Sequence, residues 1–217
     1  GAGASSVLEI PSGQTLTLTG GGGVHGTFDN LTVNNSGTIN LQTAGVNEDF
    51  KLNNGAVLNN VTGGQIRFVG GEQQIHTSAG SGTLNNSGGT ISLVGAVNGT
   101  INPTTFNVSA GTLDAGTQTL TLAGNTNYSG SRTLTGAVSM GGGTHTFADG
   151  TTISGTGTLT QAGATVTMGS VTLNKAYSLA SGTLNISAGD TVTLNGGLAF
   201  VTGSVVAGAG ATSVLDI

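Results

Sequence analysis

The residues that could perform acid–base chemistry are few and lie far apart along the chain. The 217 residues include 9 acidic residues, 4 basic residues, 3 histidines and no cysteine. Enzymes that cleave carbohydrates need carboxyl groups that converge on one bond. Here six of the carboxylates follow one another at wide intervals: Asp29, Glu72, Asp114, Asp149, Asp190 and Asp216. This spacing argues against a catalytic carboxylate pair.

One local group of charges stands apart from this scatter. Glu48 and Asp49 are adjacent, and Lys51 follows them. Neighbouring residues on a strand face opposite sides, so even this carboxylate pair need not converge. We interpret the group as a solvated loop.

The three histidines do not have the spacing of a metal site. His25 and His76 each precede a repeated apolar residue, Val33 and Leu84, by eight positions. Equivalent positions two coils apart would lie about 10 Å from each other, too far to share one zinc ion. His145 lies in a similar glycine-rich context, and we interpret all three as solvent-exposed turn residues. We therefore predict no catalytic, cofactor-binding or metal-binding residues, no cofactor, and no enzymatic activity.

The composition excludes several classes of protein. Gly, Thr, Asn and Ser make up 115 of the 217 residues, whereas charged residues make up only 6%. Disorder usually requires more charge and proline than this chain has. Four basic residues cannot form the positive patch that a nucleic-acid-binding protein needs. The most apolar stretch, 197–211, is too short to span a bilayer, so we expect neither nucleic acid nor membrane insertion.

One short segment occurs twice, once at each end of the chain. GAGASSVLEI occupies 1–10 and GAGATSVLDI occupies 208–217, with eight identical positions. We expect one domain over 1–217, forming one unit of about 207 residues in a longer tandem or end-to-end array. Neither segment has the polar character of a capping repeat. A local duplication of a single turn is the alternative.

A shorter period lies inside the long one. A leading apolar residue recurs at similar steps along the whole chain, which gives eight units that average about 26 residues. The leading residues are Leu8, Val33, Leu58, Leu84, Leu113, Leu134, Leu159, Leu184 and Leu215. Units of this length bury an apolar core only by stacking on their neighbours.

The spacing inside each unit is that of β-strands. Apolar residues recur two apart, as in Leu16/Leu18 and Ile91/Leu93, often with Thr or Ser between them. Alternation of this kind places apolar side chains on one face of a strand. Three such apolar segments per unit predict an all-β parallel β-helix (β-solenoid) of about eight coils with three short strands per coil. A β-sandwich is the competing fold, but it does not predict coils of nearly equal length.

Stacking of equivalent positions makes two further predictions. The inward residues should be buried in rows: Leu58, Leu84, Ile66, Ile91, Leu159 and Leu184. Paired asparagines recur once per unit, at 34–35, 59–60 and 85–86. Stacked amides can form hydrogen bonds along the axis, so we expect Asn ladders that stabilise the coils.

The segment LTLAGNTNYSG at 120–130 resembles the autotransporter-associated β-strand repeat of bacterial surface proteins. The whole coil pattern is similar to autotransporter passengers and filamentous-haemagglutinin-like adhesins. The segment departs from the repeat in the inserted Asn127 and in Ser131-Arg132, which stands where the repeat usually has Gly-Thr. The resemblance implies a right-handed β-helix, secretion, and an adhesive or scaffolding role. It implies no catalytic residues.

These observations predict a secreted structural protein on the bacterial cell surface or in the extracellular space. Stacked coils would form a fibre, stalk or matrix, and the partners would be other copies of the same chain, joined end to end. The alternative is an adhesin that binds glycans or host surfaces through loops such as the one at Asn102-Pro103. A carbohydrate-active enzyme is the weaker alternative.

Overall fold

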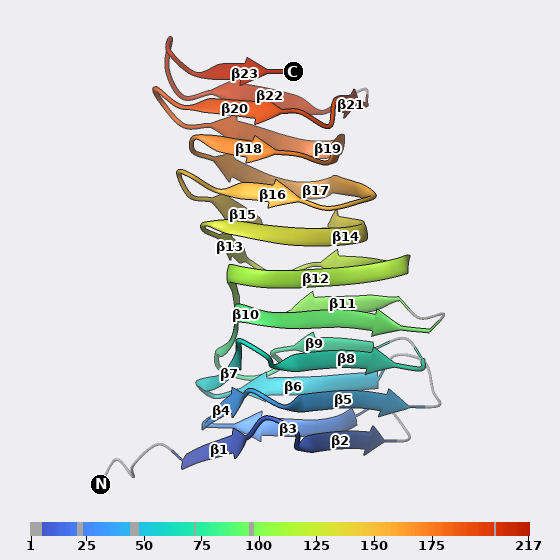
Figure 1. Ribbon diagram of the computed structural model, residues 1–217. Helices are drawn as coiled ribbons and strands as arrows, with labels where there is room; N and C mark the ends of the chain where they lie inside the picture. Colours follow the sequence, from blue (N-terminus) through green and yellow to red (C-terminus); the bar gives the residue numbers. More distant parts are fainter. Residues whose placement is uncertain (1–5, 21–23, 44–47, 72, 96–97, 202) are drawn as a thin grey trace, which may run out of the picture.

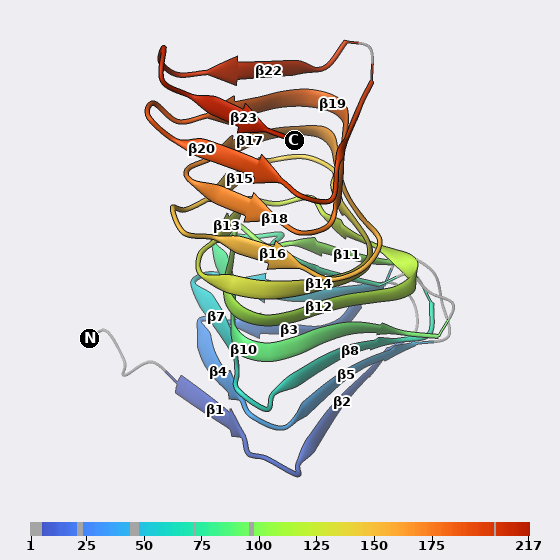
Figure 2. The same ribbon diagram turned by 45° about the horizontal axis from the view of Figure 1, so that its top comes forward.

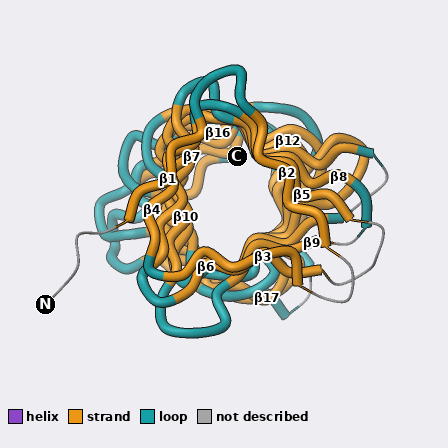
Figure 3. Tube along the Cα trace, turned by 90° about the horizontal axis from the view of Figure 1, so that it is seen from below, coloured by secondary structure: helices purple, strands orange, loops and turns teal. Residues whose placement is uncertain are grey.

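The chain winds around one axis as a β-solenoid of about nine turns (Figures 1 and 3). The structure is a computed structural model that describes residues 6–20, 24–43, 48–71, 73–95, 98–201 and 203–217. These residues form 23 strands and no helix. All strand pairings among them are parallel, each strand lying beside its equivalent one turn away. The predicted parallel β-helix is thus confirmed.

The strands lie in three walls, each of which takes one strand segment from every turn (Figure 2). The first wall contains β1 (Ser6–Ile10), β4 (Leu31–Asn35), β7 (Ala56–Val61), β13 (Thr126–Tyr128), β15 (Thr144–Phe147) and β22 (Val205–Gly208). The second contains β2 (Thr15–Gly20), β5 (Thr38–Thr43), β8 (Gln65–Val69), β16 (Thr152–Ser154), β18 (Val171–Leu173), β20 (Thr191–Leu194) and β23 (Val214–Asp216). The third contains β3 (Val24–Asp29), β6 (Glu48–Asn53), β9 (Gln73–His76), β11 (Gly99–Asn102) and β21 (Leu198–Phe200).

Five long strands bend at the corners and serve more than one wall. They are β10 (Gly82–Val94), β12 (Thr105–Leu122), β14 (Ser131–Met140), β17 (Thr158–Met168) and β19 (Ala176–Ile186). At one bend of β12, Gly111 has a φ of +88°, and a Cβ there would overlap the carbonyl oxygen of Gly89 in the turn below. Only glycine combines this conformation with so close an approach of two backbones.

The register of the first turns agrees with the predicted repeat. Leu8 lies beside Val33, Val33 beside Leu58, and Leu58 beside Leu84, all on the first wall. Leu84 then pairs with Phe106 and not with the predicted Leu113.

Later turns are shorter than the predicted repeat. Val108 pairs with Tyr128, and Tyr128 pairs with Phe147, so the chain completes each of these turns in fewer residues than the first turns use. The chain therefore forms about nine turns, close to the prediction of about eight. The extra turn arises because these later turns take 20 and 19 residues, whereas the first turns take 25 or 26.

The core is a continuous column inside the walls. All six residues predicted to be buried have no exposed surface: Leu58, Leu84, Ile66, Ile91, Leu159 and Leu184. Aromatic rings also stack inside the column. Phe28 meets Phe50 edge to face at 4.7 Å between ring centroids, and Tyr128 lies parallel to Phe147 at 4.1 Å.

Candidate functional site

An outer ladder of hydrogen-bonded side chains follows the first wall over six turns. Its rungs are one carboxylate and five amides, in stacking order Glu9, Asn34, Asn59, Asn85, Asn107 and Asn127. Each asparagine donates its Nδ2 hydrogen to the preceding rung, at 2.7 to 2.9 Å. The predicted Asn stacking is confirmed, and it extends two asparagines beyond the repeated pairs.

An inner ladder lies at the end of the same strands, inside the core. Asn35 donates to Asn60, and Asn60 donates to Asn86, each at 2.8 Å, and all three side chains are fully buried. Each amide also donates to a backbone carbonyl oxygen of the adjoining corner. The inner ladder therefore links three consecutive turns to one another at the corner between the first and second walls.

The charged group that we interpreted as a solvated loop belongs to a strand. Glu48 and Asp49 open β6, and Asp49 faces outward from the third wall beside β9. The Asp49 carboxylate accepts a hydrogen bond from Gln74, and its Oδ2 lies 3.1 Å from His76 Nε2. The loop interpretation was wrong because strand pairing continues through these charges.

The histidines lie on strands and not in turns, and His25 and His76 lie two turns apart on the third wall. His76 lies on β9, and His145 lies on β15 with its ring fully buried. His145 Nε2 is 2.8 Å from the carbonyl oxygen of Gly142. Burial lowers the His145 pKa below its ordinary value, and the Gly142 hydrogen bond opposes that shift. The prediction of exposed turn residues was therefore wrong, because all three histidines lie on strands, His145 is buried and His76 is only partly exposed. The side chain of His25 lies outside the described residues.

Two cations are buried, and within the described part of the chain their hydrogen-bond partners are backbone carbonyl oxygens and no carboxylate. Lys175 Nζ donates to the carbonyl oxygens of Leu134 and Gly136, two turns away, at 2.9 and 3.3 Å. The intervening turn has Gly155 and Gly157 at this corner, where a Cβ would overlap these two oxygens. Burial lowers the pKa of Lys175 to about 8.

Arg132 is the second buried cation. It points inward from β14 and is 3% exposed. Its guanidinium donates to the carbonyl oxygens of Val108 and Ser109 in the turn below. Burial lowers the Arg132 pKa, and its proximity to Tyr128 opposes that shift. Through backbone oxygens, Arg132 thus holds its turn to the preceding one, and Lys175 holds its turn to one two turns away.

A polar pair occupies the core of the later turns. Tyr177 Oη donates to Gln161 Oε1 at 2.6 Å, and Gln161 Nε2 donates to the carbonyl oxygens of Ala164 and Thr183. Desolvation raises the pKa of Tyr177 above its ordinary value. This pair makes the same kind of corner tie that the inner Asn ladder makes in the earlier turns.

Alternation along the strands was a signal that could have identified these inward polar residues. Arg132 lies two positions before the buried Leu134, Gln161 two after Leu159, and His145 two before Phe147. Lys175 lies in a corner, where alternation gives no direction.

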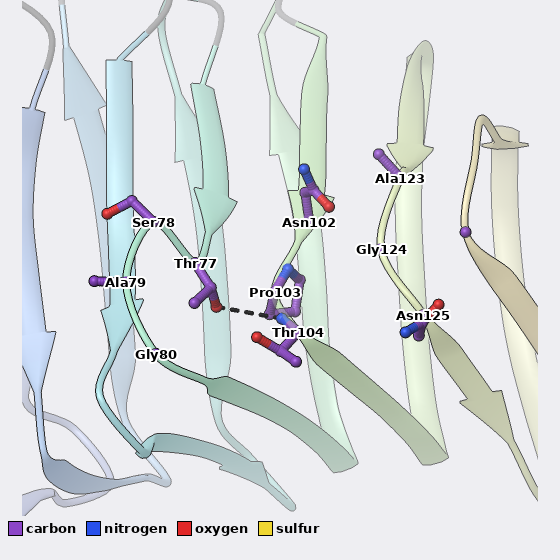
Figure 4. Close-up of a pocket in the computed structure, with 11 residues that line it drawn as sticks. Thr77, Ser78, Ala79, Gly80, Asn102, Pro103, Thr104, Ala123, Gly124 and Asn125 are labelled. Carbon is purple, nitrogen blue, oxygen red and sulfur yellow. Dashed lines mark hydrogen bonds between the residues drawn. The ribbon is translucent and has the colours of Figure 1, made fainter.

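A groove runs across the stacked turns at the corner between the third and first walls (Figure 4). It has a volume of about 370 Å³, and every residue lining it is uncharged. Thr104 N donates to Thr77 Oγ1 at 3.2 Å across neighbouring turns, while the side chains of Asn102 and Asn125 are exposed. The groove includes Asn102-Pro103, the loop named from the sequence as a binding candidate.

The two ends of the solenoid carry the exposed apolar side chains. Val7 is 56% exposed on β1, and at the other end Phe200 is 54% and Ile217 71% exposed. A hollow of about 270 Å³ opens beside Leu8, Ile10 and Leu16 at the first turn. A second hollow, of about 310 Å³, lies beside Tyr177 and Leu198 near the last turn.

The structure brings together no group of three or more metal-ligating side chains within the described ranges. Of the scattered carboxylates, Glu72 lies outside the described residues. The predicted absence of enzymatic activity and of a cofactor stays a prediction. No helix in the described part of the chain is long and apolar enough to cross a membrane. Comparison with protein-family models, curated proteins and solved structures finds no match to the chain.

Proposed function

We propose that this protein is a structural β-solenoid whose copies associate end to end into a fibre. One observation carries the proposal: the large exposed apolar side chains of the described residues all lie on the first strand or in the last turn. Apolar surface gathered in one place marks an interaction site. Because the two ends differ, joining them is a head-to-tail contact, which generates open filaments.

The backbone at each end supports the same proposal. Among the described residues, β1 has a neighbour on one side only, β4, and β21, β22 and β23 each pair only with the preceding turn. Their free edges carry backbone groups that can pair with a further strand. A second copy would satisfy these groups and cover the apolar side chains at the same time.

The outward faces of the three walls are polar and should not promote side-by-side association of the fibres. Their outward positions hold hydroxyl and amide side chains in continuous rows, such as Thr144, Thr165 and Thr183 on the first wall. Such side chains are satisfied by water and by their own neighbours along the row. Growth along the axis is therefore favoured over side-by-side aggregation.

We place the fibre on the cell surface or in the extracellular space of a bacterium. The support for this location is the resemblance of LTLAGNTNYSG at 120–130 to the repeat of secreted surface proteins. The proposed role is mechanical: backbone hydrogen bonds run along the axis, and each turn contacts its neighbours.

Light scattering and electron microscopy over a wide range of concentration test the proposal. We expect the parent chain to form linear assemblies whose mean mass rises with concentration. Phe200→Lys places a charge on the exposed end and should shift the assemblies to monomers. The control is Thr160→Lys, which adds the same charge to an outward position of the third wall, between Ser139 and Ser178. A parent chain that stays monomeric at every concentration would disprove end-to-end assembly.

A second proposal is that the corner groove binds a neutral glycan. Its supporting observation is the row of uncharged amide and hydroxyl side chains that line it, including Asn102, Asn125 and Thr104. Titration with neutral oligosaccharides, followed by nuclear magnetic resonance, should shift groove signals in the parent and not in Asn102→Ala. Asn195→Ala, at an exposed site outside the groove, serves as the control. Shifts that persist in Asn102→Ala would argue against the groove.

A further inference from the structure

The solenoid is a continuous ramp, and its two ends stop at different walls. The path begins with β1 on the first wall and ends with β23 on the second wall. A path that continued beyond β23 in the same order would next enter the third wall, above β21 (Figure 2). Two copies continue one helical path across their junction only when the first strand of one copy takes the place that would follow the last strand of the other.

We infer that, in the end-to-end contact, β1 of one copy pairs in parallel with β21 of the copy before it. The inference rests on the proposed assembly and adds its rotational register. β2 would then lie above β22, and β3 above β23. Any other rotation leaves one strand of the last turn without a partner.

The alternation of side chains fits this pairing. On β1, Leu8 and Ile10 face inward and Glu9 faces outward, because they pair with the inward Val33 and Asn35 and the outward Asn34. On β21, Leu198 and Phe200 face inward beside Tyr177 and Leu179. Leu8 would therefore cover Leu198, and Ile10 would cover the exposed Phe200.

The second pair of strands is also complementary. Leu16 and Leu18 of β2 face the core and are only partly buried. Above β22 they would meet Val206 and Gly208, which pair with the inward Leu184 and Ile186. Gly208 has no side chain, so it leaves room for Leu18.

The chain itself contains a related contact on the second wall. Residues 213–217 (SVLDI) nearly repeat residues 6–10 (SVLEI), and their central part forms β23. There Leu215 pairs with the buried Val192, and Asp216 pairs with the outward Thr193. A strand with almost the sequence of β1 thus already lies on the turn before it, with Leu inward and the acid outward.

This register fixes the symmetry of the fibre. Within the described residues the three walls hold ten, ten and nine strand segments, which is nine full turns and two further segments. Each copy would be rotated by one third of a turn from the last and would rise about 46 Å at ~4.8 Å per turn.

Disulfide cross-linking between two single variants tests the register, and the chain has no cysteine to interfere. Glu9→Cys and Ala199→Cys would be neighbours on adjacent parallel strands across the junction, within reach of a disulfide. After mixing and mild oxidation, we expect covalent dimers of the two variants. Ala207→Cys on β22 and Asp216→Cys on β23 are matched outward controls, and neither should link to Glu9→Cys at more than a tenth of that yield.

The outcomes separate the register from the assembly itself. Efficient linking of Glu9→Cys to either control position, or no linking to Ala199→Cys, would overturn the register. Light scattering of the unoxidised mixture reports assembly independently. Assemblies that link through Ala207→Cys would leave the proposed function standing, whereas monomers without any link would refute both.

Discussion

Single residues inside the column show that the core is not purely apolar. Lys175 and Arg132 are each 3% exposed, and both donate to backbone carbonyl oxygens. Burying a cation is costly unless hydrogen bonds compensate for its lost hydration. Burial of these two side chains therefore costs free energy of desolvation, while their hydrogen bonds join specific turns.

The protonation of Lys175 should make stability depend on pH. The pKa is about 8 in the folded chain and 10.5 in the unfolded chain. Between these values the unfolded chain binds more protons, so the free energy of unfolding rises with pH. We expect the melting temperature of the parent to rise from pH 7.5 to 9.5 relative to that of Lys175→Met. Parallel pH profiles for the two proteins would contradict this assignment.

A charge placed in the apolar column should be far more harmful than one on its surface. Leu84 is fully buried between Leu58 and Phe106. We expect Leu84→Asp to lower the free energy of unfolding by about 4 kcal/mol or more, through lost packing and an unpaired charge.

Thermal melting followed by circular dichroism measures this loss. The control is Thr83→Asp, one position earlier on the same strand and facing outward, which should cost about 1 kcal/mol. Equal melting temperatures for the two variants would mean that the inward and outward assignments are wrong.

At the level of elements, the ladders explain how neighbouring turns keep their register. Because each rung of the Asn ladders repeats at the same place in the strand, a slip by one residue would break every bond at once. Three adjacent turns share both ladders, through Asn34/Asn35, Asn59/Asn60 and Asn85/Asn86. The first half of the solenoid is thus fixed by amides as well as by packing.

Adjacent asparagines provide a matched test of the two ladders. Asn60→Ala leaves buried partners on Asn86 and Thr90 without a donor, and we expect a loss of about 2–3 kcal/mol. Asn59→Ala breaks the outer ladder, where water can replace the amide, and should cost less than about 1 kcal/mol. Urea denaturation compares the two, and a larger loss for Asn59→Ala would reverse the ranking of the ladders.

The sequence predicted the fold class and the register of the first turns, but not the register of the later ones. Because Val33, Leu58 and Leu84 are nearly equally spaced, their stacking could be predicted from the sequence. Farther along, Leu113 belongs to the second wall and Leu159 to the third. All three walls alternate inward Leu with outward Thr, so the pattern does not distinguish one wall from another.

The site was less predictable than the fold. The Asn ladders lie where the repeated asparagine pairs predicted them, and the groove includes the loop at Asn102-Pro103 that the sequence offered as a binding candidate. The buried Lys175 depends on its two distant carbonyl partners and on the glycines between them, which no local pattern records. Polar residues that contact across turns can be identified only once the turn lengths are known.

Over the whole molecule, stability should fall from the middle toward the ends, because each turn pairs its strands only with the adjacent turns. β10 and β12 have a turn on either side, whereas four of the five residues of β1 are exposed. We expect amide hydrogen exchange to be slowest in β10 and β12 and fastest in β1 and β21–β23. Measured at low concentration, uniform protection along the chain would contradict this gradient, and added protection at both ends at high concentration would accompany assembly.

The outer Asn ladder also contributes a dipole along the axis of the solenoid. An amide group is a dipole with its positive end at the NH₂, and all five outer amides point that end toward the first turn. The inner ladder points the opposite way but ends at Asn86, so the outer dipoles beyond it are not cancelled. Glu9 places its negative charge at the positive pole of this row, as acidic residues do at the amino end of an α-helix.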